Sequence, residues 1–456
     1  MTSILWFRRD LRLSDQAALA AAASEGPVVP VFILDDETPR HRRMGGASRW
    51  WLHHSLSSLA ADLEAKGSRL ILRRGTATDI LPDLLKESGA SCVHAMAHYE
   101  PWWRNAEHKL ADRIDLRLHD GNYLLPPGTL KTGSGGGYRI YTPFWRAMSQ
   151  HMPPDAAQAR PRAIPAPDAW PASDILKEWD LLPTKPDWAG GFAHDWTPGE
   201  AAARERVADF IDLAAAYDER RNFPSEEGTS RLSPHLHFGE VSPAYVWHRV
   251  SEGRGDASTF LKELVWRDYA QNLILQFPAY GRENATARFD RMPWRDLREA
   301  KGDFAAWKKG MTGYPIVDAG MRQLWATGWM HNRVRMIAAS FLIKHLLIDW
   351  RYGEQWFWDT LVDADYGSNT VNWQWTAGSG VDANMFVRIM APLTQSPKFD
   401  SAGYIRRWVP ELAKLPDSAI HDPEEHGCRP ATYPPKIIGH REARERALAA
   451  YAKVKG

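Results

Sequence analysis

The chain has 456 residues, of which 44% are hydrophobic and 25% are charged, and this balance excludes a disordered protein. No apolar run reaches the roughly 18 residues of a membrane-spanning helix, and the charged residues at 8–10 come too early for a secretory signal. The formal net charge is +1, so we expect any surface that binds nucleic acid to be a local patch.

Short apolar runs alternate with amphipathic helical patterns over the first 140 residues. The runs predict β-strands at 3–7, 28–34, 70–72, 92–96 and 116–118. Strands that alternate with helices in this way are typical of a doubly wound parallel sheet. We therefore expect an α/β domain over residues 1–140.

Proline and alanine dominate the next part of the chain. Nine prolines lie between residues 151 and 198, and the flexible stretch GSGGGY precedes them at 133–138. This composition is typical of a semi-extended segment that packs a core poorly. We therefore expect an interdomain linker over residues 141–198.

Helical patterns fill the rest of the chain. Amphipathic stretches at 200–221, 258–277 and 320–350 predict helices, and strand-like alternation is scarce after residue 199. The expected fold is an α/β domain with a doubly wound parallel sheet, followed by a larger all-α domain over residues 199–456.

A polar loop, GTSRLSP at 228–234, precedes an apolar run in the helical half. Its hydroxyl groups and free backbone N–H groups suit a phosphate or a diphosphate. An ordinary helix start, with Ser233 as the N-cap and Pro234 in the first turn, explains the same residues. The residues alone leave both interpretations open.

Two helical segments present faces that mix aromatic, polar and charged side chains. The faces consist of Trp329, Asn332, Arg333 and Met336 on one segment, and of Glu263, Trp266 and Arg267 on the other. Such a face suits the wall of a pocket for a planar polar ligand. A helix at a domain boundary is the alternative.

Acidic and amide side chains gather in DADYGSN at 363–369, where a ligand-facing loop and a solvated turn are both possible. The stretch lacks the later glutamate of a calcium loop. The chain also has 22 tryptophans, an excess that core packing, base stacking or redox-active side chains would each explain. Two cysteines, Cys92 and Cys428, are too few for a disulfide framework, so we expect a reducing, cytoplasmic setting and no metal.

Together these segments resemble the photolyase/cryptochrome family, and in particular the DNA photolyases of class I or the related class III that repair cyclobutane pyrimidine dimers. The resemblance extends over nearly the whole chain. Its segments are WFRRDLRLSD at 6–15, EGTSRLSPHLHFG at 227–239, ELVWRDY at 263–269, GYPIVDAGMRQLWATGWMHNRVRM at 313–336, LLIDWRYGEQ at 346–355 and DADYGSNTVNWQW at 363–375.

The resemblance implies that the helical domain binds FAD in a U-shaped conformation. The positions that match the family's FAD-binding residues are Tyr217, Thr229, Ser230, Arg231, Leu232, Ser233, Trp329, Asn332, Arg333, Arg335, Asp363, Asp365 and Asn369. It also implies that Arg335 pairs with Asp363, and that Asn369 lies near flavin N5 and supports the reduced flavin.

The resemblance further implies light-driven electron transfer from FAD to a flipped-out DNA lesion. The positions expected at the lesion and its DNA are Arg221, Glu263, Trp266, Arg267, Asn332, Met336 and Trp375. Catalytic roles are implied for Glu263 and Asn369. Three tryptophans match a photoreduction chain, with Trp373 nearest the flavin, Trp350 in the middle and Trp294 at the surface.

Asn332 and Met336 stand where (6-4) photolyases carry histidines. Neither side chain donates a proton at neutral pH as an acid would, which favours cyclobutane dimers as the substrate. His331 lies next to this face, and its position on the expected helix directs it away, so we expect it to be structural.

Four alternatives remain: a cryptochrome-type photoreceptor, a (6-4) photolyase, a flavin oxidoreductase and a nucleic-acid-binding module, for which the expected strong basic charge is missing. Signalling relatives carry a long C-terminal tail, and this chain ends at Gly456 soon after a charged helix, which favours repair. A second, antenna chromophore is expected to be methenyltetrahydrofolate, with a deazaflavin or an empty site as alternatives. We expect UV-damaged DNA as the partner of a monomer that needs neither a membrane nor a protein partner.

Overall fold

The computed structural model describes residues 1–383 and 386–455. The N-terminal part is a parallel sheet of five strands in the order β3-β2-β1-β4-β5, as the alternating pattern predicts. The strands are β1 (Ser3–Phe7), β2 (Val28–Leu34), β3 (Ile71–Arg74), β4 (Cys92–Met96) and β5 (Leu116–His119). The central strand β1 pairs with β2, with Ser3 opposite Val28, and with β4, with Ser3 opposite Cys92.

Four helices cover the two faces of this sheet. They are α1 (Ala17–Glu25), α2 (Gly46–Glu64), α3 (Ala77–Ser88) and α4 (Pro101–Ala111). Residues of α1 and α2 pack with Leu5 and Phe7 on one face, and residues of α3 and α4 pack with Ile4 and Trp6 on the other. Because β1, β2 and β4 are covered on both sides, they are buried along their whole length and mostly apolar, with His94 of β4 as an exception.

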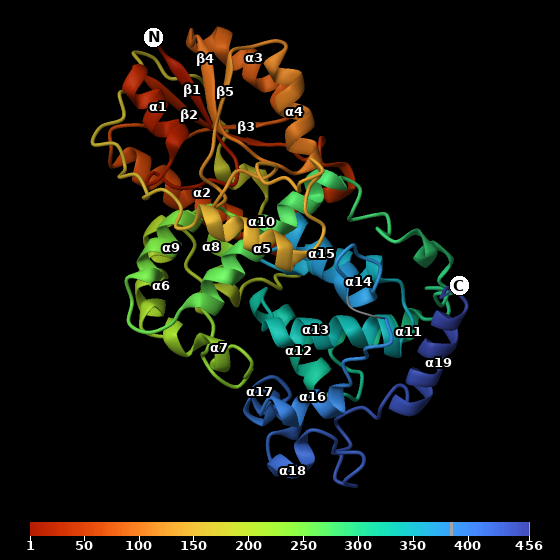
Figure 1. Cartoon of the computed structure of the whole chain (residues 1–456). Coiled ribbons are helices and arrows are strands. Elements are labelled where there is room, and N and C mark those ends of the chain that lie inside the picture. The colour runs from red at the N-terminus through yellow and green to blue at the C-terminus, as the bar shows by residue number, and fades with distance from the viewer. Residues whose placement is uncertain (384–385, 456) are drawn as a thin grey trace.

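The rest of the molecule is mainly helical, and Figure 1 shows these helices beyond the sheet, in orange-yellow for α5 and in green to blue for the later ones. The helices are α5 (Tyr141–Met148), α6 (Glu200–Ile211), α7 (Tyr217–Arg220), α8 (Ser233–His237), α9 (Pro243–Ser251), α10 (Ser258–Gln276), α11 (Lys301–Lys309), α12 (Pro315–Thr327), α13 (Asn332–Ser340), α14 (Trp350–Thr360), α15 (Tyr366–Ala377), α16 (Pro392–Lys398), α17 (Ala402–Trp408), α18 (Asp417–Ile420) and α19 (His440–Ala452). The short helical turns used below are η1 (Arg40–Arg42) and the π-helix η7 (Phe341–His345). Within the described ranges, no helix combines the length and apolar character needed to cross a membrane.

The segment expected as a linker, 141–198, packs more firmly than its composition predicts. Its first residues form α5, whose Phe144 and Met148 are buried in the helical core. Farther along, Trp179 and Phe192 are buried against the α2 side of the sheet. The backbone N–H of Val28 also donates to the carbonyl of Pro165, at 2.8 Å. The expectation of a poorly packing linker is therefore wrong, because widely spaced aromatic residues anchor the proline-rich chain to the α/β domain.

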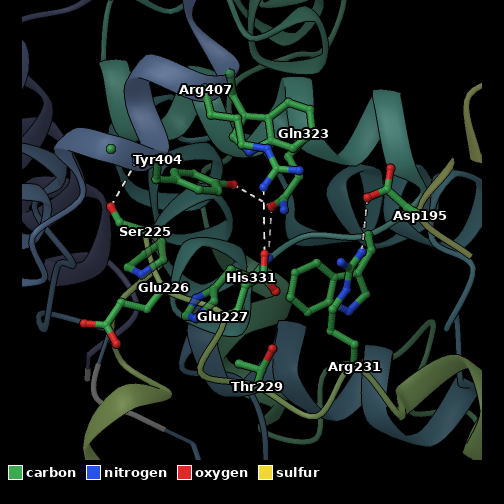
Figure 2. A pocket seen from close by; sticks show the side chains of 14 residues that line it. Asp195, Ser225, Glu226, Glu227, Thr229, Arg231, Gln323, His331, Tyr404 and Arg407 are labelled. Atoms are coloured by element: carbon green, nitrogen blue, oxygen red, sulfur yellow. Dashed lines mark hydrogen bonds and ion pairs between the residues drawn. The ribbon is translucent and has the colours of Figure 1, made fainter. Parts of the chain in front are cut away.

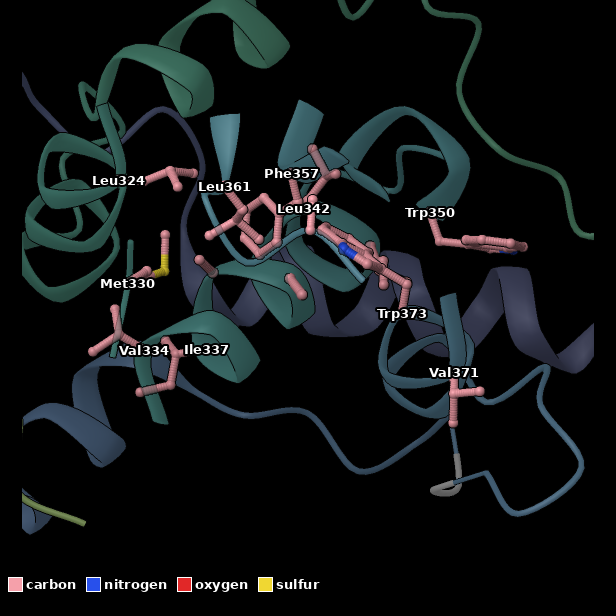
Figure 3. Packing of buried hydrophobic residues seen from close by; sticks show 14 of the residues in the cluster. Leu324, Met330, Val334, Ile337, Leu342, Trp350, Phe357, Leu361, Val371 and Trp373 are labelled. Atoms are coloured by element: carbon pink, nitrogen blue, oxygen red, sulfur yellow. The ribbon is translucent and has the colours of Figure 1, made fainter. Parts of the chain in front are cut away.

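Tryptophan and aliphatic side chains fill the core of the helical part. Figure 3 shows Trp373 of α15 and Trp350 of α14 among Leu342, Phe357 and their neighbours. A Cβ atom at Gly353 would lie 2.2 Å from the ring of Trp373. Glycine at this position therefore allows the ring to lie against α14.

Candidate functional site

A cavity of about 570 Å³ opens between α7, α8, α10, α13 and α15. Most of the residues that the sequence singled out line it. They are Tyr217, Arg221, Thr229, Ser230, Arg231, Leu232, Ser233, Glu263, Trp266, Arg267, Trp329, Asn332, Arg335, Met336, Asp363, Asp365 and Trp375. The volume lies within the about 300–1,000 Å³ that is usual for pockets that bind small molecules.

The polar loop at 229–233 forms one wall of this cavity, and its conformation is unusual. Arg231 has a φ of 51°, in the left-handed region that few residues other than glycine adopt. Ser233 does not cap a helix: its Oγ donates to Asp363 Oδ2 at 2.6 Å. Leu232 occupies the N-cap position of α8, without a side-chain bond. A helix therefore does begin here, with Pro234 in its first turn, but the expectation that Ser233 caps it is wrong, and the Ser233 hydroxyl group belongs to the cavity wall.

The two acids of the 363–369 stretch are held in different ways. Asp363 accepts from Arg335 Nη1 at 3.1 Å and Nη2 at 2.8 Å, so the pair expected from the resemblance is present. Asp365 caps α15, because its Oδ1 accepts from the backbone N–H of Ser368 at 2.7 Å. Both carboxyl groups are about nine-tenths buried, which fixes two anionic groups beside the polar loop.

The helix α13 begins later than the sequence pattern predicts. Trp329 lies in the loop before it, and His331 is the N-cap, with its Nδ1 accepting from the backbone N–H of Arg333 at 3.2 Å. Figure 2 shows how Gln323 and Tyr404 surround this turn: the backbone N–H of His331 and the hydroxyl of Tyr404 both donate to Gln323 Oε1. Burial lowers the pKa of His331 to about 3, so this histidine is neutral and structural.

Arg333 was expected to line the flavin, and the structure places it elsewhere. Its Nη2 donates to Asn222 Oδ1, and its guanidinium lies 4.4 Å from the ring centre of Phe399. With Trp329 outside the helix, the face that would direct Arg333 inward does not exist. Arg333 therefore connects the start of α13 to Asn222 and Phe399 and is not among the residues that line the cavity.

Asn369 lies in an adjoining cavity of about 110 Å³, together with Trp373. Its Nδ2 donates to Glu354 Oε1 at 2.9 Å, and Glu354 in turn accepts from Arg42 Nη1 at 2.6 Å. Because the carboxylate accepts from the Asn369 amide, the Asn369 carbonyl oxygen is left to face the cavity. Burial raises the pKa of Glu354, and the Arg42 guanidinium opposes that shift.

Stacked aromatic rings form the mouth of the main cavity. The Trp266 side chain is 37% exposed, and Tyr141 covers one of its faces with the ring centres 3.4 Å apart and the planes within 5°. Tyr141 is held in turn, since its hydroxyl donates to the carbonyl of Lys262 at 2.9 Å and its backbone N–H donates to Asp382 at 2.8 Å. One face of Trp266 is therefore occupied within the protein.

Charged groups at the mouth are paired with each other. Arg221 Nη1 and Glu263 Oε1 form an ion pair beside Trp266. Arg267, which we expect at the DNA, lines the cavity. Its guanidinium donates to the carbonyls of Asn122 and Leu236 and lies 4.5 Å from the Tyr123 ring centre, so Arg267 joins α10 to the α/β domain.

The three tryptophans expected to form a relay lie in one region of the helical core. Trp373 and Trp350 are buried. The ring centre of Trp373 lies 5.0 Å from that of Phe357 and 6.4 Å from that of Trp307. Trp350 lies one turn of α14 from Gly353, where the Trp373 ring rests. Trp294 is partly buried, and the neighbouring backbone N–H of Arg295 donates to the carbonyl of Leu347.

Sequence reasoning missed three residues of this site. Tyr141 fell within the expected linker, although the aromatic character of YTPFW offered a signal. Glu354 lies within the recognised segment at 346–355 and carried no assigned role. Arg42 is separated from Glu354 by 312 residues, and no local pattern reveals that contact.

Comparisons with known proteins agree with this geometry. Residues 3–167 match the family model described as DNA photolyase, and residues 260–453 match the model described as the FAD-binding domain of DNA photolyase. The second match contains most of the residues that line the cavity, including those contributed by α13 and α15.

Curated relatives and solved structures extend over the whole chain. A deoxyribodipyrimidine photo-lyase of Agrobacterium fabrum is 51% identical over 99% of this chain and 98% of its own length. Cryptochrome-1 of Arabidopsis thaliana is 35% identical over 99% of this chain and 70% of its own length. The crystal structure of a bacterial class III photolyase from Agrobacterium tumefaciens matches with a TM-score of 0.94 at 50% identity, over 100% of this chain and 98% of that one.

Proposed function

The chain belongs to the photolyase/cryptochrome family, and we propose that it is a deoxyribodipyrimidine photolyase that uses blue light to split cyclobutane pyrimidine dimers in UV-damaged DNA. The observation that carries the proposal is one cavity, which joins the polar loop at 229–233 to the exposed ring of Trp266. A cofactor and two joined bases would meet there.

The residues of the cavity fit FAD. Arg231 and His237 line it, and each has a buried ring or guanidinium nitrogen without a hydrogen-bond partner among the described residues. Such nitrogen atoms require a polar partner, and FAD offers phosphate, ribityl and ring acceptors. When bound and reduced, FAD supplies the light-excited electron that opens the cyclobutane ring and then accepts it back.

On the cofactor side of the cavity, the protein's contribution is to hold and orient the FAD. We assign the diphosphate to the loop at 229–233, where the hydroxyl groups and backbone N–H groups are concentrated. The Arg335–Asp363 pair fixes a buried charge beside it, and the Asn369 carbonyl oxygen is a fixed acceptor in the adjoining cavity. Because Glu354 and Arg42 hold Asn369 from behind, its amide cannot rotate freely.

On the substrate side, the lesion must leave the DNA duplex before it reaches the cavity, as the family of base-flipping enzymes requires. The free face of Trp266, together with Trp375 and Met336, offers a stacking surface. Stacking contributes roughly 1–3 kcal/mol per base, which offsets much of the cost of flipping. Arg221 and Glu263 then separate from one another, and we assign Arg221 to a phosphate and Glu263 to the polar edge of a thymine.

The cavity wall also favours cyclobutane dimers over (6-4) products. Asn332 and Met336 supply no titrating acid beside the lesion. His331 caps α13 and is neutral, and burial likewise lowers the pKa of His237 well below its ordinary value. A reaction that depends on a protonated histidine therefore lacks its acid in this cavity.

The α/β domain offers little space for a second chromophore at the carboxyl ends of β1 and β2. The cavity there measures about 50 Å³. Glu100 is buried, and its Oε1 forms an ion pair with Arg9 Nη1 at 2.7 Å. Trp103 fills the same region, stacked edge-on against Trp6. A larger cavity of about 480 Å³ opens beside Tyr99 and Arg104, so an antenna chromophore, methenyltetrahydrofolate first, stays a prediction. We further propose that the domains meet near residues 140 and 199 and that the protein acts as a monomer in the cytoplasm.

An absorption spectrum followed by a repair assay tests the proposal. The purified protein should carry FAD and, after reduction, should restore a defined thymine dimer under blue light while leaving a dark sample and a (6-4) oligonucleotide unchanged. A protein that takes up no flavin, or that repairs only the (6-4) product, would contradict it.

A matched pair of variants tests the lesion surface. Trp266→Ala should weaken binding to dimer-containing DNA about 5–150-fold, in line with the loss of one stacked base, and should retain FAD. Trp325→Ala is the control, since Trp325 is equally exposed but stacks with Trp356 on another part of the molecule. Equal affinities for the two variants would mean that Trp266 does not contact the lesion.

A further inference from the structure

A group of metal-binding side chains lies in the α/β domain, at the edge of the sheet formed by β4 and β5. Cys92 and His94 are two residues apart on β4, so their side chains project from the same face. Met96 continues this face and packs against α1, whose last residue is Glu25. The topology therefore brings a thiol, an imidazole and a carboxyl group together.

The three side chains are close enough to share one ion. One ligand atom from each of Glu25, Cys92 and His94 lies within 4.8 Å of the other two. His94 Nε2 and Glu25 Oε2 are 3.5 Å apart. Cys92 and His94 are almost fully buried, and Glu25 closes the group from the surface.

His94 is prepared to act as a ligand. The residue is 1% exposed, and its Nε2 has no hydrogen-bond partner among residues 1–383 and 386–455. Its other ring nitrogen, Nδ1, lies 3.0 Å from His119 Nε2. When Nδ1–H donates to His119, the lone pair of His94 Nε2 points at the group, as in metal-ligating histidines whose second nitrogen is hydrogen-bonded.

We propose that Glu25, Cys92 and His94 bind one zinc ion, with water as the fourth ligand and His119 orienting His94. A thiolate, an imidazole and a carboxylate together match the ligands of Zn²⁺, whereas the thiolate disfavours Mg²⁺ and Ca²⁺. The number of cysteines predicted no metal site. That prediction considered cysteines alone, whereas here a histidine and a glutamate supply the other two protein ligands. The ion would tie the end of α1 to β4, away from the FAD cavity, and this proposal is independent of the proposed function.

Arg117 competes with the proposed zinc ion for the Glu25 carboxylate. Its Nη1 lies 2.7 Å from Glu25 Oε2, and its Nη2 lies 2.8 Å from Asp115 Oδ2. The Arg117 and Glu25 side chains are 42% and 45% exposed, so both can move. Zinc would release Glu25 from Arg117, which keeps Asp115 as its partner. Removal of Arg117 should therefore strengthen zinc binding.

Equilibrium dialysis of the full-length, flavin-loaded protein tests the site. After EDTA treatment and dialysis against micromolar ZnCl₂, elemental analysis should find one zinc per chain in the wild type and in Cys428→Ser, which removes the other cysteine. His119→Ala should weaken binding by roughly 10–100-fold, the usual effect of losing a partner behind a ligand. Glu25→Gln and Cys92→Ser should weaken it more, and Arg117→Ala should strengthen it.

Glu25→Gln keeps the test decisive if Cys92→Ser fails to fold, because the Glu25 side chain is half exposed. X-ray absorption at the zinc edge should show one sulfur ligand that disappears in Cys92→Ser. Absence of stoichiometric zinc in the wild type would overturn the proposal. Zinc binding that persists in Glu25→Gln and is lost in Cys428→Ser would also overturn it. A zinc affinity that does not change in Arg117→Ala would do the same.

Discussion

Two aromatic residues show how single side chains prepare the cavity. Tyr141 and Trp266 stack face to face, so the face of Trp266 that we propose for the lesion is backed by a second ring rather than by water. Because the Tyr141 hydroxyl and backbone N–H are both bonded, the stack is held in place before any DNA arrives. A rigid platform loses little side-chain entropy when a base stacks on it.

Replacement of Tyr141 by alanine should therefore weaken lesion binding without direct contact with the lesion. An aromatic stack is worth about 0.5–1.5 kcal/mol beyond its buried area, so we expect a roughly 2–12-fold higher Kd for dimer-containing DNA with FAD content unchanged. Tyr141→Phe keeps the ring and is the control. If Tyr141→Phe weakens binding as much as Tyr141→Ala, the hydroxyl bond to Lys262 matters rather than the stack.

Trp373 is the ring through which electrons would enter the cavity from the protein, because it lies in the same small cavity as Asn369. Trp373→Phe should block light-driven reduction of oxidised bound flavin, since phenylalanine is harder to oxidise. Repair by chemically reduced protein should continue. Flash photolysis of Trp350→Phe and Trp307→Phe identifies the next ring: loss of photoreduction in Trp307→Phe alone would contradict the relay through Trp350.

At the level of elements, the π-helix η7 contains a buried lysine. Lys344 is 1% exposed, and its Nζ donates to the carbonyl of Arg388 at 2.7 Å. Burial, assisted by the charge of Arg388, lowers the pKa of Lys344 from 10.5 to about 7. The folded protein therefore favours the neutral amine at alkaline pH.

This shift predicts a pH dependence of stability. Between pH 7 and 10.5 the unfolded chain binds the proton that folded Lys344 lacks, so the free energy of unfolding gains a contribution that rises with pH across this window. The slope is at most about 1.4 kcal/mol per pH unit. Urea unfolding of Lys344→Met should show a flatter profile than the wild type, whereas exposed Lys309→Met should not. Parallel profiles for all three proteins would refute the assignment.

Elements that depend on local pattern could be predicted from the sequence. The five strands begin and end within two residues of the predicted positions. The central strands β1 and β2 are buried on both faces and form apolar runs that are easy to recognise. The start of α13 was misplaced, since the spacing of Trp329 and Asn332 resembles one helix face even though Gly328 ends α12 in the left-handed region and His331 caps the next helix. Contacts between distant segments, such as Arg42 with Glu354, leave no local trace.

At the scale of the whole molecule, the α/β domain helps to position the cavity. Arg42 extends from η1 near the sheet to Glu354 on α14, and Glu354 holds Asn369. The side chains of Arg42 and Glu354 are 3% and 0% exposed, so the pair is isolated from water. The Arg42 Nη2 also donates to the carbonyl of Gly281 at 2.7 Å. One buried ion pair thus connects the two parts of the fold to the amide beside Trp373.

Arg42→Met should leave the Glu354 charge buried and unpaired, which costs about 3–5 kcal/mol of the free energy of unfolding. Arg43→Met is the control, because the Arg43 side chain is 61% exposed. The double variant Arg42→Met with Glu354→Leu should recover most of the stability, since no charge remains buried. Asn369 should still lose its bond to the Glu354 carboxylate and keep only the bond to the backbone carbonyl of residue 354. Reduced flavin should then reoxidise faster in air in the double variant than in Arg43→Met. If the double variant regains stability and also keeps the wild-type reoxidation rate, the pair serves only to join the domains and does not position Asn369.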